Sequence, residues 1–229
     1  MYHVILKEWI NPDTQVTLLG EAHPEKYEVT AVGEDAHLPE LDEKDRLLIQ
    51  KLIIPEQCTS IAEAAFENLV NLRCVEICAP IRSVGAKAFC GCAHLEEIVL
   101  PDSVDSIGEA AFLGCTSLSK IQIPQSLAKI EARTFAKCTE LWSINLPATI
   151  SVIGESAFEG CEWLNSLTIP DQLRELGAFA FAGSGLKEAH IPDGIKRLHK
   201  GVFKGCTKLT TVTGMQNVGY VDEDVFSST

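Results

Sequence analysis

Residues 153–170 read IGESAFEGCEWLNSLTIP, and versions of this stretch recur along most of the chain. In most units a leucine follows the phenylalanine by six residues, and in the central units a proline ends the apolar I-x-I piece. One unit is a residue short, because a residue is missing between Gly183 and Leu186. Successive phenylalanines of the series lie 22 or 23 residues apart, and they are Phe66, Phe89, Phe112, Phe135, Phe158, Phe181, Phe203 and Phe226.

A repeat of this length predicts a solenoid. The alternating I-x-I piece predicts a short strand with one face directed inward, and the following proline cannot donate to a strand ladder. The small residues before each phenylalanine predict a compact turn or a short helix. One unit of 23 residues cannot bury its own apolar side chains, whereas stacked units bury them and align their strands in a parallel sheet. We therefore expect the phenylalanine rings to line up along one internal axis.

The stretch 153–170 resembles the BspA-type leucine-rich repeat, and the resemblance covers roughly residues 47–229. It implies an α/β fold, a right-handed leucine-rich-repeat solenoid of 23-residue repeats. In such a solenoid a parallel sheet lines the concave face, and short helices or turns lie on the convex side. It also implies a non-catalytic scaffold for adhesion and protein–protein contact, often at a bacterial or protist cell surface. The motif residues of the family are structural, so none is expected to be catalytic.

Residues 1–46 lack the repeat and hold 11 Asp and Glu against 4 Lys and Arg. We expect them to form a polar N-terminal cap, which every solenoid requires. Its predicted parts are strands at residues 2–9 and 15–19 and a helix over residues 39–50. Residues 27–33 resemble the close of a repeat. The first, degenerate strand of the array is predicted at residues 51–54, and the repeats at residues 47–229.

The last repeat is incomplete, because the chain stops three residues after Phe226. Two hypotheses follow: the sequence is a fragment of a longer array, or a partner such as a second copy covers the uncapped edge. The N-terminal residues show no secretory signal peptide, so the sequence as written predicts a cytoplasmic protein or one whose leader was removed. The family resemblance instead suggests a secreted or cell-surface location.

The formal net charge is −13, from 19 Lys and Arg against 32 Asp and Glu. This balance argues against nucleic acid or an anionic membrane as the main partner, since both attract basic surfaces. No apolar run approaches the ~20 residues of a membrane-spanning helix, so membrane insertion is not expected. The segment 187–208 is locally basic, which leaves open a solvated face or contact with an acidic partner.

Five cysteines each follow a phenylalanine by three residues. We expect them to form an internal ladder of buried free thiols, because parallel stacked side chains suit a disulfide poorly. The redox state of Cys74 and Cys90 stays open. The run from Cys90 to His94 has no second Cys/His pair at zinc-site spacing, so neither a metal nor a cofactor is expected. The ladder residues are Cys92, Cys115, Cys138, Cys161 and Cys206.

No nucleophile–base arrangement or paired carboxylate stands outside the repeat, so the chain is not expected to be an enzyme. The best binding candidate is the concave strip of outward strand positions, with a solvated, ligand-free sheet as the simpler alternative. Trp142 and Trp163 are expected near the strand entry as exposed aromatic residues. They could anchor a protein or stack on a glycan, with packing against a neighbouring turn as the simpler alternative. The strip comprises Glu76, Glu97, Lys120, Gln122, Ser143, Asn145, Ser166, Thr168, Glu188, His190, Thr211 and Thr213.

Overall fold

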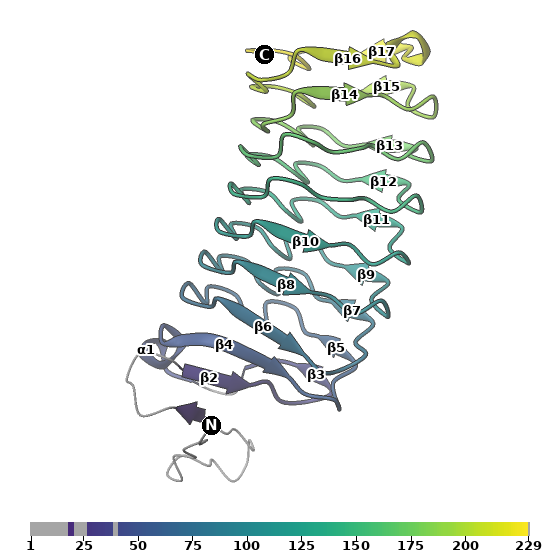
Figure 1. The fold of residues 1–229 in the computed structure, drawn as a ribbon. Helices are drawn as coiled ribbons and strands as arrows, with labels where there is room; N and C mark the ends of the chain where they lie inside the picture. Colours follow the sequence, from purple (N-terminus) through teal and green to yellow (C-terminus); the bar gives the residue numbers. More distant parts are fainter. Residues whose placement is uncertain (1–17, 21–26, 39–40, 229) are drawn as a thin grey trace.

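The computed structural model describes residues 18–20, 27–38 and 41–228. Over this range the chain is a parallel-strand solenoid of about eight turns, as the repeat spacing predicts (Figure 1). The predicted strand at residues 2–9 lies outside the described residues. Secondary structure is sparse, because each turn of the solenoid contributes only short strands joined by tight turns.

The longer strands lie in one row, called the main sheet here, which begins as a six-stranded sheet. Neighbours are parallel from β2 onward, and only β1 runs antiparallel to β2. Single bridges from Lys120 to Ser143 and from Ser143 to Ser166 continue the row, which ends in a separate parallel pair. The strands of this row are β1 (Leu18–Gly20), β2 (Tyr27–Thr30), β4 (Ile49–Ile54), β6 (Cys74–Ile77), β8 (Glu97–Val99), β10 (Lys120–Gln122), β14 (Glu188–His190) and β16 (Thr211–Thr213).

A second row of strands, each two residues long, runs beside the main sheet (Figure 1). It pairs in three parallel groups: β3 to β9, β11 to β13, and β15 with β17. A single 3₁₀ turn, η1 (Met215–Asn217), links the last two strands of the chain. The short strands are β3 (Asp35–Ala36), β5 (Ser60–Ile61), β7 (Ser83–Val84), β9 (Ser106–Ile107), β11 (Lys129–Ile130), β12 (Val152–Ile153), β13 (Glu175–Leu176), β15 (Arg197–Leu198) and β17 (Tyr220–Val221).

The phenylalanines form one column through the interior, which confirms the expected internal axis. Successive rings from Phe66 to Phe226 lie between 5.4 and 5.8 Å apart, centroid to centroid. The seven rings from Phe66 to Phe203 are fully buried. Main-chain bonds tie the turns that carry them, as when the Phe112 amide donates to the Thr134 carbonyl at 2.9 Å. Each unit therefore completes its core on its neighbours.

The solenoid begins earlier than the sequence predicts. Residues 27–33 were expected to close a repeat, and residues 51–54 to form its first strand. Instead β2 is already a main-sheet strand, parallel to β4, and β3 is parallel to β5. The prediction was wrong because strand pairing here depends on buried residues such as Val29 and Ala36. No phenylalanine of the series marks this unit. The role of residues 1–46 as a cap stays a prediction.

The helix predicted over residues 39–50 is wrong in extent. Of the described residues 41–50, only those of α1 (Glu43–Arg46) are helical, with Asp42 as the N-cap and Leu47 as the C-cap. Ile49 is buried and opens β4, which pairs with strands on both sides. A helix this short gains little from its own hydrogen bonds, so the sheet takes the following residues.

The turns around each phenylalanine are not helical, because two positions per repeat have left-handed backbone. One of them, two residues after the phenylalanine, is glycine in five units, with φ between 66° and 75°. Lys137 occupies this position at φ 60°. An L-residue pays a steric penalty in this conformation that glycine avoids.

Lys137→Gly is therefore expected to raise the free energy of unfolding by about 0.5–1 kcal/mol. The measurement is urea denaturation followed by circular dichroism. Lys137→Ala is the matched control, because it removes the same exposed side chain and keeps the Cβ atom. A glycine variant no more stable than the alanine variant would contradict the strain argument.

Candidate functional site

The twelve residues of the predicted strip lie on the outward side of the main sheet, called the strand face here. Eleven of them are exposed and Ser143 is half-buried. They are positioned by alternation, because the residues between them, such as Ile121 and Ile144, point into the core. The predicted strip residues from Glu76 to Thr213 thus share one side of the solenoid.

The charges on the strand face gather in its first half. The Lys51 ammonium lies 3.0 Å from carboxylate oxygens of both Glu28 and Glu76. These hydrogen bonds, led by that to Glu76, raise the pKa of Lys51 above its usual value. At the entry to the strands Arg73 pairs with Glu96 at 2.9 Å. Opposite charges in successive coils therefore neutralise one another there.

The middle of the strand face is uncharged and is flanked by large apolar side chains. Its outward residues are Ser143, Asn145, Ser166 and Thr168. Trp142 is 50% exposed and Trp163 is 64% exposed, in adjacent coils at the strand entry.

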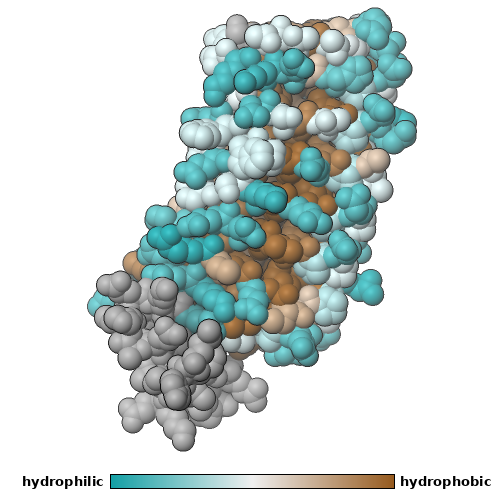
Figure 2. All heavy atoms as spheres, in the orientation of Figure 1, coloured by the Kyte–Doolittle hydropathy of each residue, from teal (hydrophilic) through white to brown (hydrophobic). Residues whose placement is uncertain are grey.

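Hydrophobic side chains also gather along the length of the solenoid. Figure 2 shows them as a band with hydrophilic side chains on both sides. Val99, which ends β8 on the strand face, is 61% exposed. Val99 is not among the twelve strip residues that were predicted from the sequence.

The main sheet is interrupted at the shortened repeat. Among the described residues, no strand pairing joins residues 166–169 to β14, and none joins β13 to β15 in the second row. The coils remain stacked through their turns, where the Phe158 amide donates to the Ala180 carbonyl at 2.8 Å. We call this boundary the seam.

The missing residue shifts the contacts across the seam. The Gly185 amide donates to the Cys161 carbonyl at 3.0 Å, one residue earlier than the repeat would place it. In the preceding pair of coils, the carbonyl equivalent to that of Glu162 is Thr139, and it accepts from the Trp163 amide. At the seam the Lys208 ammonium reaches past one coil and donates to the Glu162 carbonyl at 3.2 Å.

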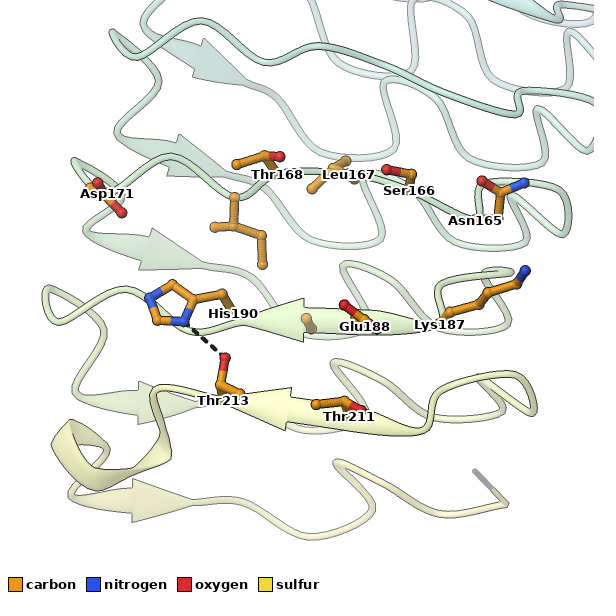
Figure 3. Close-up of a pocket in the computed structure, with 12 residues that line it drawn as sticks. Asn165, Ser166, Leu167, Thr168, Asp171, Lys187, Glu188, His190, Thr211 and Thr213 are labelled. Atoms are coloured by element: carbon orange, nitrogen blue, oxygen red, sulfur yellow. Dashed lines mark hydrogen bonds between the residues drawn. The ribbon is translucent and has the colours of Figure 1, made fainter.

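A groove of about 410 Å³ opens on the strand face at the seam (Figure 3). His190 and Thr213 lie in its wall, with 2.9 Å between Nδ1 and Oγ1. Sequence reasoning found half of its lining and missed the groove, although the 22-residue spacing from Phe181 to Phe203 was its signal. The lining residues are Asn165, Ser166, Leu167, Thr168, Ile169, Asp171, Lys187, Glu188, Ala189, His190, Thr211 and Thr213.

The five ladder cysteines are buried free thiols. Each thiol donates to the carbonyl of the phenylalanine one repeat earlier, as from Cys138 to Phe112 at 3.2 Å. Desolvation raises the pKa of Cys92 to about 12 and raises that of Cys138 far above its ordinary value. These thiols satisfy turn carbonyls in the core. Cys74, by contrast, is exposed, and Cys90 is half-buried.

The basic segment 187–208 is partly paired with acidic groups of the chain. Arg197 forms two hydrogen bonds to Asp222, at 3.0 and 2.9 Å, and its guanidinium lies 4.9 Å from the Tyr220 ring centre. Lys200 lies 2.9 Å from Glu223. Acidic groups of the last coil thus already balance part of this charge. Self-association through the last coil stays a prediction.

The described residues contain no group of three or more His, Cys, Asp or Glu that could hold a metal ion. Cys90 and His94, which belong to the run considered as a metal tract, contact different parts of the chain. The His94 ring nitrogen Nδ1 lies 2.6 Å from the Val70 carbonyl, and Cys90 lies near Glu67. Over the same part of the chain no helix is long and apolar enough to cross a membrane.

Solved structures similar to this chain include bacterial leucine-rich repeat proteins. The leucine-rich repeat protein of T. pallidum is 28% identical, with a TM-score of 0.61, over 94% of this chain and 86% of that one. A leucine-rich repeat protein from Bacteroides ovatus is 22% identical, with a TM-score of 0.64, over 96% and 80%. The pneumococcal vaccine antigen PcpA is 17% identical, with a TM-score of 0.57, over 96% and 78%. The latter two show the fold alone.

A search of curated proteins finds no significant match. Six copies of the BspA type leucine rich repeat region match residues 45–144 and 128–229. Scaffolds of this kind are generally non-catalytic, and family members are often secreted or surface-exposed. The family suggests a protein-binding or adhesion scaffold, and the comparisons give no support to glycan binding. The repeat, its stacked core and these matches together show that the chain belongs to the BspA-type leucine-rich repeat family.

Proposed function

We propose that this protein is a non-catalytic recognition scaffold that binds another protein through the middle of the strand face. The observation that carries the proposal is the exposure of Trp142 and Trp163 beside an uncharged strip. Exposed tryptophans dominate the binding energy of many interfaces, because a large apolar surface is buried around one polar N–H group. Location at a cell surface, where family members often act, is part of the proposal.

The form of the strand face supports a protein partner. Seven gaps of ~4.8 Å between strands give a face about 34 Å long, which suits a macromolecular contact. Uncharged side chains such as Asn145 and Thr168 lose little on desolvation compared with a charged side chain. The paired charges around Lys51 would then lie at the rim of the contact.

The test replaces Trp142 and Trp163 together by alanine. Both rings are exposed, so we expect an unchanged melting temperature within a few degrees and loss of at least tenfold in affinity for the partner. The partner is obtained by cross-linking the intact protein at the surface of cells from its own environment. Affinity is then measured by biolayer interferometry.

Tyr220→Ala is the matched control, because Tyr220 is a 60% exposed aromatic residue in β17, away from this strip. It is expected to bind like the unmodified protein. If the double tryptophan variant binds with unchanged affinity, the proposed interface is wrong.

A further inference from the structure

At the seam the strand face is hollowed by the groove. Each preceding coil of the row keeps at least one strand bridge to the next, as from Ser143 to Ser166, whereas here residues 166–169 and β14 are not paired. The core side chains Leu167, Ile169 and Ala189 consequently line the groove, although each is at most 9% exposed. The floor of the groove is therefore apolar, and its walls carry hydroxyl groups together with the polar side chains of Asn165, Glu188 and His190.

The two ends of the groove carry opposite charges. Figure 3 shows Lys187 at one end and Asp171 at the other. Both residues are exposed, and within the described residues neither charged group forms an ion pair. Lys187 aligns with Asn165 across the seam, so the ends are about six residues apart along the strand, at most ~20 Å.

Resting on the proposed function, we propose that the groove at the seam holds an extended peptide segment of the partner protein, about six residues long. An apolar side chain of the peptide lies on the floor formed by Leu167, Ile169 and Ala189. A carboxylate at one end of the peptide pairs with Lys187, and a basic group at the other end pairs with Asp171. The volume of about 410 Å³ is within the range of sites that enclose short ligands.

The lining favours a peptide over a glycan. An apolar floor suits a protruding aliphatic side chain, which sugars lack, and the lining contains no Phe, Tyr or Trp ring on which a sugar could stack. Oppositely charged ends match a chain that can carry both a carboxylate and an ammonium or guanidinium. The hydroxyl groups of Ser166, Thr168 and Thr211 can donate to or accept from peptide groups between them.

The test is an array of synthetic six-residue peptides, acetylated and amidated, probed with the intact protein. A second arm leaves the C-terminal carboxylate free, which distinguishes a chain end from an acidic side chain as the source of the carboxylate. We expect selection of peptides with an acidic group, an apolar residue and a basic group in that spacing. Dissociation constants of the selected peptides are measured by fluorescence polarisation.

Lys187→Glu is expected to weaken binding of the selected peptides about tenfold, since attraction of the peptide carboxylate becomes repulsion. Peptides whose acidic group is replaced by lysine are expected to bind this variant better than the unmodified protein. Lys196→Glu is the matched control, because Lys196 is exposed and lies outside the groove lining, and it should leave peptide affinity unchanged. An alanine inserted between Ser184 and Gly185 restores a 23-residue spacing and is expected to close the groove and abolish peptide binding.

Three results would overturn the proposal: no sequence selection on the array, unchanged affinity in Lys187→Glu, or competition by neutral oligosaccharides instead of peptides. If the insertion variant does not fold, the peptide affinities of the Lys187→Glu variant alone test the proposal. Loss of partner binding in the double tryptophan variant would still support the proposed function after such a result. If the groove binds peptides and the double tryptophan variant still binds the partner with unchanged affinity, the groove proposal is supported and the tryptophan interface is wrong.

Discussion

Replacing Phe135 by alanine is expected to lower the free energy of unfolding by about 3–5 kcal/mol. Phe135 is fully buried in the middle of the ring column, 5.6 Å from Phe112 and 5.5 Å from Phe158. The cavity would lie between the two halves of the array. In a solenoid each unit contacts only its neighbours, so the loss also weakens the coupling of those halves.

Guanidinium denaturation followed by circular dichroism measures this effect. Phe226→Ala is the matched control, because that ring stacks on Phe203 at 5.7 Å but is only partly buried in the last coil. Its expected loss is smaller by at least 1 kcal/mol, since truncation of a partly exposed ring removes less buried surface. Equal losses at both positions would show that the column does not couple the coils.

Raising the pH above 9 is expected to destabilise the protein steeply. Thiols in the unfolded chain titrate near 9.0, whereas desolvation raises the pKa of Cys92 to about 12 in the folded state. Desolvation also raises the pKa of Cys115, Cys138 and Cys161 well above 9.0. Above pH 9 the folded state therefore holds more protons than the unfolded state, and stability falls as the pH rises.

The expected loss is large because the four thiols act together. At pH 10 each contributes about 1.4 kcal/mol, so together they lower the free energy of unfolding by about 6 kcal/mol relative to neutral pH. Below pH 9 the contribution is constant, since both states are protonated. The loss continues until the pH reaches the folded pKa, about 12 for Cys92.

Urea titrations between pH 7 and pH 10.5 measure this dependence. Cys138→Ala is expected to reduce the slope above pH 9.5 by about 1.4 kcal/mol per pH unit, because one linked proton is removed. Leu141→Ala is the control, since it truncates a buried side chain that does not titrate, and its slope should match that of the unmodified protein. An unchanged slope in the Cys138 variant would refute the linkage to buried thiols.

The sequence predicted the interior better than the ends. Regular spacing identified the phenylalanine column and the inward strand positions, because every unit repeats the same apolar pattern. The helix predicted over residues 39–50 was too long. The prediction rested on the local acidic and leucine-rich composition, which carries no information about the two strands that pair with β4. The start of the solenoid at β2 was not predicted from the sequence, because no phenylalanine marks that unit.

For the candidate site, the strand face could be predicted and the groove could not. Alternation alone places Ser166 and Thr168 outward. The exposure of Trp163 was also anticipated from its place at the strand entry. The loss of main-chain pairing at the seam depends on how two particular coils meet, and one missing residue changes that meeting without changing the apolar pattern.

The amino-acid sequence by itself determined the repeating unit, its buried side chains and its membership of a stacked array. Each unit carries its own apolar side chains, so the residues that become buried can be identified from the sequence of that unit. Tertiary structure alone decided which coils pair their main chains and which charges meet, such as Arg197 with Asp222. Hydrogen bonds and ion pairs act over only a few ångströms, so they depend on the spacing between coils that no single unit encodes.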